Sequence, residues 1–246
     1  MLQALNASAA GMAAQEQQLN AISNNIANIS TDGYRAQQVA FSDLLYNQVE
    51  ETGTDTATGA GARAGVTGES LAGGGVRQTG QPLDLAISGQ GFFELKRANG
   101  QIVLTRDGHF GLDAKRRLVS ADGAYLNPPI TLPAGVSPGE VRVDADGTVV
   151  AGTTTVGKIT VVNVAAPNKL LSSGSNEFTA TAASGPIHKA AGAPIQQGAL
   201  EGSDVELAPE MATMTTTERS YQLGSTAIGL EDQMMSIADD IVTPAS

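Results

Sequence analysis

The chain has no cysteine and no tryptophan, and aromatic residues make up only 4% of its 246 residues. Without cysteine it can form no disulfide, no thiolate metal site and no cysteine nucleophile. The 41% hydrophobic fraction therefore comes mostly from alanine, valine, leucine and isoleucine, while glycine is abundant at 29 residues. This composition favours many short strands and turns over a large catalytic domain lined by aromatic pockets.

Long apolar runs and basic clusters are also scarce. Because no run of about 18 apolar residues exists, the sequence predicts no membrane-spanning helix. The N-terminus lacks a cationic stretch followed by an apolar run, so we expect export, if it occurs, to use a route without a cleaved leader. A formal net charge of -11 disfavours nucleic acid, since phosphate binding requires clustered Lys and Arg. The basic cluster at 115–117 lies between Asp113 and Asp122, which favours a solvated turn.

Patterns that would indicate chemistry are weak. Neither His109 nor His188 has a sequence partner at metal-ligand spacing. Residues 144–147 superficially resemble a calcium loop, but Thr153 stands where an EF-hand requires glutamate, and the flanks are strand-like. The glycines between 73 and 80 lack the Gly-Lys-Ser/Thr ending of a phosphate loop. The sequence therefore predicts no enzyme, no cofactor and no metal site.

Apolar residues recur every seven positions near both ends of the chain. The N-terminal stripe consists of Leu5, Met12, Leu19 and Ile26, with Ile22 beside it; the C-terminal stripe consists of Leu207, Met214, Tyr221, Ile228 and Met235, with Met211 beside it. A seven-residue repeat places one stripe along a helix, as in the seam of a coiled coil. The alternative is an ordinary core-facing stripe, but the narrowness of these stripes and the length of the second segment favour pairing between helices. We predict helices over 2–28 and 204–242, with Asp204 as the N-cap of the second.

The middle of the chain has strand and turn character. Leu83, Leu85 and Ile87 alternate with smaller or polar residues, which predicts a strand. Four turn dipeptides predict hairpins: Asn99-Gly100, Asp107-Gly108, Asp122-Gly123 and Asp146-Gly147. Residues 51–81 contain few large apolar side chains, so we expect an extended linker. Earlier in the chain, Phe41, Leu44, Leu45 and Tyr46 have helix-like spacing.

These features predict an α+β chain, in which long N- and C-terminal helices form a coiled-coil-like helical domain and a mainly antiparallel β body lies between them. We place the N-terminal helix and its following segment at 1–46 and an extended Gly/Thr/Ala-rich linker at 47–81. The β-rich body is expected over 82–198, and the C-terminal helix completes the helical domain at 199–246. A chain with a long helix at each end, each carrying an apolar stripe suited to another helix, is typical of an assembly subunit.

Several motifs resemble one family. Residues 24–34, Asn-Asn-Ile-Ala-Asn-Ile-Ser-Thr-Asp-Gly-Tyr, closely resemble the N-terminal signature of bacterial flagellar rod and hook proteins, with signature positions Asn24, Asn25, Asn28, Thr31, Gly33 and Tyr34. Residues 41–46, 83–93 and 105–110 resemble three further motifs of this family. Residues 197–205, followed by 210–211 and 218–221, resemble its C-terminal signature. Departures are visible at Leu104, where an aromatic residue is common, at Arg116, where glycine is common, and at Asp204, which replaces a frequent Asn.

Within this family the length and residues 44–46 most resemble the distal rod subunit, with the proximal rod subunit a close rival and the hook subunit a weaker one. The resemblance implies a structural subunit that stacks helically into a hollow periplasmic shaft, with terminal helices innermost, and carries torque from motor to hook. It implies as partners further copies of the chain, adjacent rod subunits, the hook protein, the flagellar type III export apparatus and, where an outer membrane exists, the P and L rings. It implies neither nucleic acid nor a small-molecule substrate.

Two other classes of protein are less compatible with the sequence. A peptidoglycan-cleaving enzyme of the same organelle would need catalytic acids in a cleft, and the scarcity of aromatic residues argues against it. A soluble regulatory binding module would not need two long terminal helices. If the chain is an assembly subunit, we expect its terminal helices to become ordered on assembly. We also expect Asn24 and Asn25 to hydrogen bond across subunits, instead of Asn28 alone serving the local turn.

Overall fold

A computed structural model describes residues 2–43, 47–49, 56–58, 61–70, 72–190 and 192–242. The chain forms two compact units. The helical unit comprises Met1–Ile26, Gln37–Thr67 and Glu206–Ser246, and the β unit comprises Ala27–Ala36 and Gly68–Val205. The β unit thus takes in residues on both sides of the 82–198 range predicted for the β body. Among the described residues, no helix combines the length and the apolar character needed to cross a membrane.

Two long helices dominate the helical unit. Helix α1 spans Leu2–Ala27 and helix α2 spans Leu207–Val242, so both predicted helices are confirmed to within a few residues. The N-cap prediction for Asp204 is wrong, because α2 begins three residues later. The Asp204 carboxylate instead accepts a hydrogen bond from the Ala36 backbone N–H at 2.7 Å. The local sequence favoured an N-cap, but the partner of Asp204 is a residue 168 positions away along the chain, which local sequence cannot indicate.

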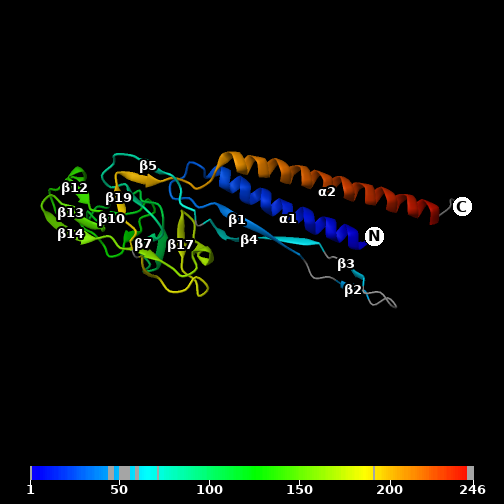
Figure 1. The fold of residues 1–246 in the computed structure, drawn as a ribbon, viewed down its shortest axis with the longest axis horizontal. Coiled ribbons are helices and arrows are strands. Elements are labelled where there is room, and N and C mark those ends of the chain that lie inside the picture. Colours follow the sequence, from blue (N-terminus) through cyan, green and yellow to red (C-terminus); the bar gives the residue numbers. More distant parts are fainter. Residues whose placement is uncertain are drawn as a thin grey trace. The chain divides into compact units, whose positions relative to one another are not determined.

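The two helices run antiparallel (Figure 1). Asn25 Nδ2 of α1 donates to Glu210 Oε1 of α2 at 3.1 Å. Nearer the start of α1, a Cβ added at Gly224 would lie 2.9 Å from Met12 Cγ, so the backbone of α2 approaches α1 closely there. The two contacts are 13 residues apart along α1, from Met12 to Asn25, and 14 residues apart along α2, from Gly224 back to Glu210. This contact between the terminal helices is shown, and knobs-into-holes packing between them stays a prediction.

Four strands accompany the helices: β1 (Gln37–Asp43), β2 (Asn47–Val49), β3 (Thr56–Thr58) and β4 (Ala62–Glu69). Strand β1 pairs with β4, and β2 pairs with β3 in antiparallel register. Phe41 therefore lies in a strand, and the helix-like spacing that began with it was misleading, because one turn of spacing is too short to establish a period. Leu44, Leu45 and Tyr46 lie outside the described residues.

The β unit is built from short strands. They are β5 (Val76–Gln78), β6 (Leu85–Ile87), β7 (Phe92–Lys96), β8 (Ile102–Thr105), β9 (Gly111–Leu112), β10 (Leu118–Val119), β11 (Tyr125–Leu126), β12 (Val141–Val143), β13 (Thr148–Ala151), β14 (Thr154–Lys158), β15 (Val161–Asn163), β16 (Leu171–Ser172), β17 (Glu177–Thr179), β18 (His188–Lys189), β19 (Ile195–Gln197) and β20 (Ala199–Glu201). Two short 3-10 helices, Pro138–Glu140 and Pro167–Lys169, lie between strands. The predicted α+β class, with two terminal helices and a mainly antiparallel β body, is confirmed.

The largest sheet of the β unit follows the order β16-β17-β8-β7-β11-β10-β9, and β15 joins it by pairing with both β7 and β18. Strands β12-β13-β14 form a meander, and β6 pairs with β19 as β5 does with β20. Strand β7 is central, because Phe93 and Leu95 are fully buried. The ring of Phe93 meets that of Phe110 edge to face, with centroids 5.3 Å apart. Aliphatic side chains supply most of the core, as the composition predicted.

Three of the four turn dipeptides connect paired strands as predicted. Gly100, Gly123 and Gly147 all have positive φ between antiparallel partners. Asp107-Gly108 is the exception, because no hairpin forms there. Gly108 instead passes so close to strand β6 that an added Cβ would lie 1.6 Å from Leu85 O. Its backbone carbonyl accepts from the Leu85 N–H at 3.0 Å, so the absence of a side chain permits this contact.

We predict that Gly108→Ala destabilises the β unit by roughly 2–4 kcal/mol, because a methyl group at this site must displace backbone. The matched control is Gly111→Ala, where an added Cβ has nothing within 4 Å and φ is not positive. Denaturant unfolding of the full chain measures both variants. Equal stability of the two would contradict the close approach of Gly108 to Leu85.

Candidate functional site: helix faces and a buried ion-pair cluster

The face of α2 that is partly or fully covered follows a heptad pattern with steps of four and three. Its buried or half-buried positions are Glu210, Met214, Thr217, Gly224, Ile228 and Glu231, with Thr213 beside them; Tyr221 and Met235 continue the same spacing but are exposed. Thr217 is the most covered, at 5% exposure, while Tyr221 and Met235 stay more than a third exposed. Of the predicted C-terminal stripe, only Met214 and Ile228 are half-buried on this inner seam. The rest of the seam is polar or small, which allows the backbones to approach at Gly224.

The predicted residues of α1 lie on its covered side. Ile22 is buried, and Leu5, Met12, Leu19 and Ile26 are half-buried. Met214 and Ile228 of α2 are half-buried as well. These side chains are thus partly used within the chain itself, and their role at an interface between subunits stays a prediction.

A second apolar stripe on α2 was missed by the sequence reasoning. Leu223, Leu230 and Ile237 are spaced by seven, and Met234 lies between the last two. All four side chains are more than half exposed, and Leu223 reaches 71%. At about 100° per residue this outer stripe lies far round the helix from Gly224 and Ile228. The seven-residue spacing of Leu223, Leu230 and Ile237 could have been found in the sequence. It was overlooked because the stripe through Met214 and Ile228 already explained a heptad repeat in this helix. Leu207 and Met211 are also exposed, near the start of the helix.

The signature asparagines have different roles. Asn25 is buried at 2% exposure, and its Oδ1 accepts from the Gln37 N–H at 2.8 Å while its Nδ2 donates to Gln37 O and Glu210 Oε1. These partners belong to the same chain, so the amide of Asn25 has an intramolecular function that we did not predict. Asn28 Oδ1 accepts from Thr31 Oγ1 at 3.2 Å, in keeping with a role in the local turn. Asn24 is exposed, and a hydrogen bond from it to another subunit stays a prediction.

The rest of the signature packs against the last strand of the β unit. Gly33 has φ of 69°, its N–H donates to Glu201 O at 2.7 Å, and an added Cβ would lie 2.5 Å from Asp107 N. Tyr34 O accepts from the Asp204 N–H. Only glycine fits the position of Gly33, which explains in physical terms why the signature contains it. The two sequence motifs that carry the resemblance, one near each end, thus meet in the β unit.

At this meeting point lies a buried ion-pair cluster. Arg35 Nη2 lies 3.1 Å from Glu201 Oε1, and Arg106 Nη1 lies 3.0 Å from Glu201 Oε2. All three side chains are 5% exposed or less. Arg106 also donates to the backbone carbonyl of Gly89 at 2.6 Å. Burial lowers the pKa of Arg106 to about 10, with the nearby charge of Arg35 acting in the same direction and that of Glu201 opposing it.

The remaining sequence candidates have structural roles. Arg117 pairs with Asp113 at 2.7 Å and lies over the Tyr125 ring, which confirms the turn interpretation of the basic cluster. Arg116 has φ of 62°, the left-handed conformation that suits the glycine common in the resembling family. His109 Nδ1 lies 2.9 Å from Asp84 Oδ1, and Asp146 pairs with Lys158 across a hairpin.

Comparison with known proteins links these features to the flagellum. Three family models match: "Flagella basal body rod protein" at residues 5–35, "Flagellar hook protein FlgE/F/G D1 domain" at 86–151 and "Flagellar basal body rod FlgEFG protein C-terminal" at 196–241. The flagellar basal-body rod protein FlgG of Buchnera aphidicola subsp. Acyrthosiphon pisum is 34% identical, over 96% of this chain and 98% of its own length. FlgG of Caulobacter vibrioides is 34% identical over 98% and 99%. FlgF of Mesorhizobium japonicum is 29% identical over 85% of each chain.

We predict that Asn25→Ala destabilises the helical unit by about 1–3 kcal/mol, because it leaves the Gln37 N–H and the Glu210 carboxylate without their amide partner. Asn24→Ala is the control, since this neighbouring side chain is exposed, and its effect should stay within about 0.5 kcal/mol. Thermal unfolding with hydrogen exchange of α1 and α2 measures both. Equal effects of the two variants would show that the Asn25 contacts contribute nothing.

Glu69 gives a prediction about pH. Partial burial raises its pKa from 4.5 to about 7, against the opposing effects of a hydrogen bond to Ser172 and the charge of Arg35. Because the folded-state pKa lies above the unfolded one, the folded chain holds this proton more tightly. The contribution of this proton to the free energy of unfolding is full below about pH 4.5 and is lost as the pH rises to about 7.

The expected loss is roughly 1–2 kcal/mol, because solvent screens the exposed part of the Glu69 side chain. Glu69→Gln, a neutral mimic of the protonated acid, should remove this part of the pH dependence. The measurement is the difference in unfolding free energy between wild type and variant from pH 4 to pH 8. A difference that does not change with pH would contradict the raised pKa.

Proposed function

The chain belongs to the flagellar basal-body rod protein family and is a structural rod subunit of the basal body, and we propose that it is the distal rod subunit, polymerising helically through its terminal helices. Two relatives called FlgG match over nearly their whole length, whereas the FlgF relative matches over less of it at lower identity. In this family FlgG is the distal rod subunit and FlgF the proximal one, so these matches favour the distal position.

The exposed outer stripe of α2 is the observation that best supports the proposed polymerisation. A fully buried Leu, Ile or Met side chain contributes about 1.5–3 kcal/mol relative to an exposed one. Leu223, Leu230, Met234 and Ile237 are each more than half exposed, so covering them offers roughly 3–6 kcal/mol per copy. The heptad spacing of this outer stripe suits another helix, and a second copy of the chain supplies helices of matching spacing.

The wider role follows from the family and is part of the proposal. The polymer forms a hollow periplasmic shaft that transmits torque from the motor to the hook. Adjacent rod subunits and the hook protein contact its ends, and the P and L rings surround it where an outer membrane exists. The flagellar type III apparatus exports the chain without a cleaved signal peptide. The absence of cysteine is compatible with this route, because the exported chain then forms no disulfide.

We predict that Leu230→Asp abolishes polymerisation while leaving the monomer folded. Leu230 is exposed in the single chain, so its replacement should change monomer stability by no more than about 0.5 kcal/mol. An aspartate enclosed in the polymer would be an unpaired buried charge, which costs several kcal/mol. The control is Ser236→Asp, which adds the same charge at an exposed position of α2 that lies at least 100° round the helix from each residue of the outer stripe.

Sedimentation and electron microscopy of the purified chain measure polymer, and a swimming assay measures rod function. Loss of polymer and swimming in Leu230→Asp, with both retained in Ser236→Asp, is the expected result. Normal polymer from Leu230→Asp would overturn the proposed role of the outer stripe.

A further inference from the structure

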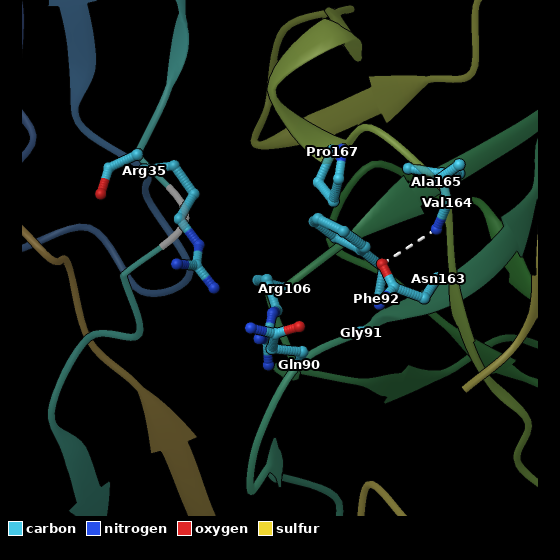
Figure 2. A pocket seen from close by; sticks show the side chains of 10 residues that line it. Arg35, Gln90, Gly91, Phe92, Arg106, Asn163, Val164, Ala165 and Pro167 are labelled. Atoms are coloured by element: carbon cyan, nitrogen blue, oxygen red, sulfur yellow. Dashed lines mark hydrogen bonds between the residues drawn. The ribbon is translucent and has the colours of Figure 1, made fainter. Parts of the chain in front are cut away.

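A cavity of about 200 Å³ lies beside the ion-pair cluster, entirely within the β unit. Figure 2 shows the guanidinium of Arg35 pointing across it toward Arg106 and Gln90. The Phe92 ring and Pro167 form an apolar wall on another side. Asn163 also lines the cavity, and its Oδ1 accepts from the Val164 N–H at 2.9 Å, so the remaining group of this amide is a donor.

The two arginines bring unused donors to this cavity. Arg35 Nη1 and Arg106 Nε are buried and have no hydrogen-bond partner within the part of the chain that the structure describes. The other nitrogens have partners: Arg35 Nη2 donates to Glu201 Oε1, Arg106 Nη1 lies 3.0 Å from Glu201 Oε2, and Arg106 Nη2 donates to Gly89 O. Glu201 Oε2 is itself buried without a hydrogen bond in the described part of the chain. A buried N–H donor without an acceptor is costly, and more so on a charged group. Both arginines line the same cavity.

The three side chains of the ion-pair cluster, Arg35, Arg106 and Glu201, together carry one net positive charge. Two buried guanidiniums face the single carboxylate of Glu201. Two further acids lie close by: Glu69, whose pKa of about 7 leaves much of it protonated at neutral pH, and Asp204, whose carboxylate accepts from the Ala36 N–H. One carboxylate bound beside the two arginines would balance the charge of these three side chains. Arginine is the side chain that suits carboxylate recognition, because its planar fork presents parallel N–H donors.

We propose that this cavity is a binding site for a carboxylate group, held by Arg35 and Arg106, with its substituent against Phe92 and Pro167. A carboxylate supplies one charge, which matches the excess of the cluster. A dianion such as phosphate would exceed that charge, and it has no apolar part for the Phe92 side. The carboxylate comes either from a free organic acid or from an acidic side chain of a second copy of the chain.

The test uses the full chain and sodium benzoate, with sodium acetate as a smaller probe. Calorimetry and thermal unfolding are measured at constant ionic strength set with chloride. We expect saturable benzoate binding, weaker acetate binding, and no binding of benzamide, which keeps the ring but lacks the charge. Arg35→Gln and Arg106→Gln should each weaken benzoate binding at least tenfold. Arg142→Gln is the matched control, because it removes the same charge from an exposed arginine of the β unit and should leave binding unchanged.

A second variant keeps the test decisive if the arginine variants fail to fold. Ala165 is exposed at the edge of the cavity and takes no part in the ion pairs, so Ala165→Leu should reduce benzoate binding while the chain stays folded. Absence of saturable benzoate binding in the wild type would overturn the proposal. So would equal binding of benzamide, or binding of inorganic phosphate without benzoate.

Self-association distinguishes the two sources of the carboxylate. If a second copy supplies it, saturating benzoate should dissociate polymer or slow its formation, and Arg142→Gln should show the same response. If the ligand is a free acid, benzoate should bind without changing polymer formation. Both results support the carboxylate site, and neither depends on whether the outer stripe of α2 carries assembly.

Discussion

Glu201 places one carboxylate between two buried guanidiniums, and the same residue accepts the Gly33 N–H through its backbone carbonyl. Because Arg35, Arg106 and Glu201 come from three distant parts of the sequence, these contacts hold the β unit together where local structure cannot. A buried charge of this kind is stable only while it is paired, and loss of one partner from such a cluster typically costs 3–5 kcal/mol. The path of the signature segment between Thr31 and Ala36 depends on this constraint.

Much of the fold was predictable because its signals are local. A period close to 3.6 persists over the 26 residues of α1 and the 36 residues of α2, so both helices could be placed from spacing alone. Asn-Gly and Asp-Gly turns favour the positive φ of hairpins, which predicted three of them. Asp107-Gly108 is also an Asp-Gly dipeptide, but its glycine contacts Leu85 and forms no hairpin. Contacts between distant segments leave no local pattern in the sequence.

The candidate site was predictable only in part, for the same reason. The stripe from Leu207 to Met235 predicted that α2 packs against another helix. It could not indicate that Thr217 and Gly224 lie on the covered face, since neither is a large apolar residue. The motifs around Arg35, Arg106 and Glu201 were each recognisable. Nothing within any one of them indicated that their charged side chains would meet, because that contact depends on the folding of the whole β unit.

The two faces of α2 differ in how much large apolar surface they carry, and this difference bears on how the helix would be stabilised in an assembly. The inner seam combines Met214 and Ile228 with threonine, glycine and glutamate, so the contact with α1 buries little apolar area for a helix of 36 residues. The outer stripe instead carries large side chains that the single chain leaves exposed. Since hydrophobic stabilisation scales with buried apolar area, covering the outer stripe would contribute more to holding α2 in place than the inner seam does. In the proposed polymer, a helix built in this way would gain much of its stability from neighbouring copies of the chain.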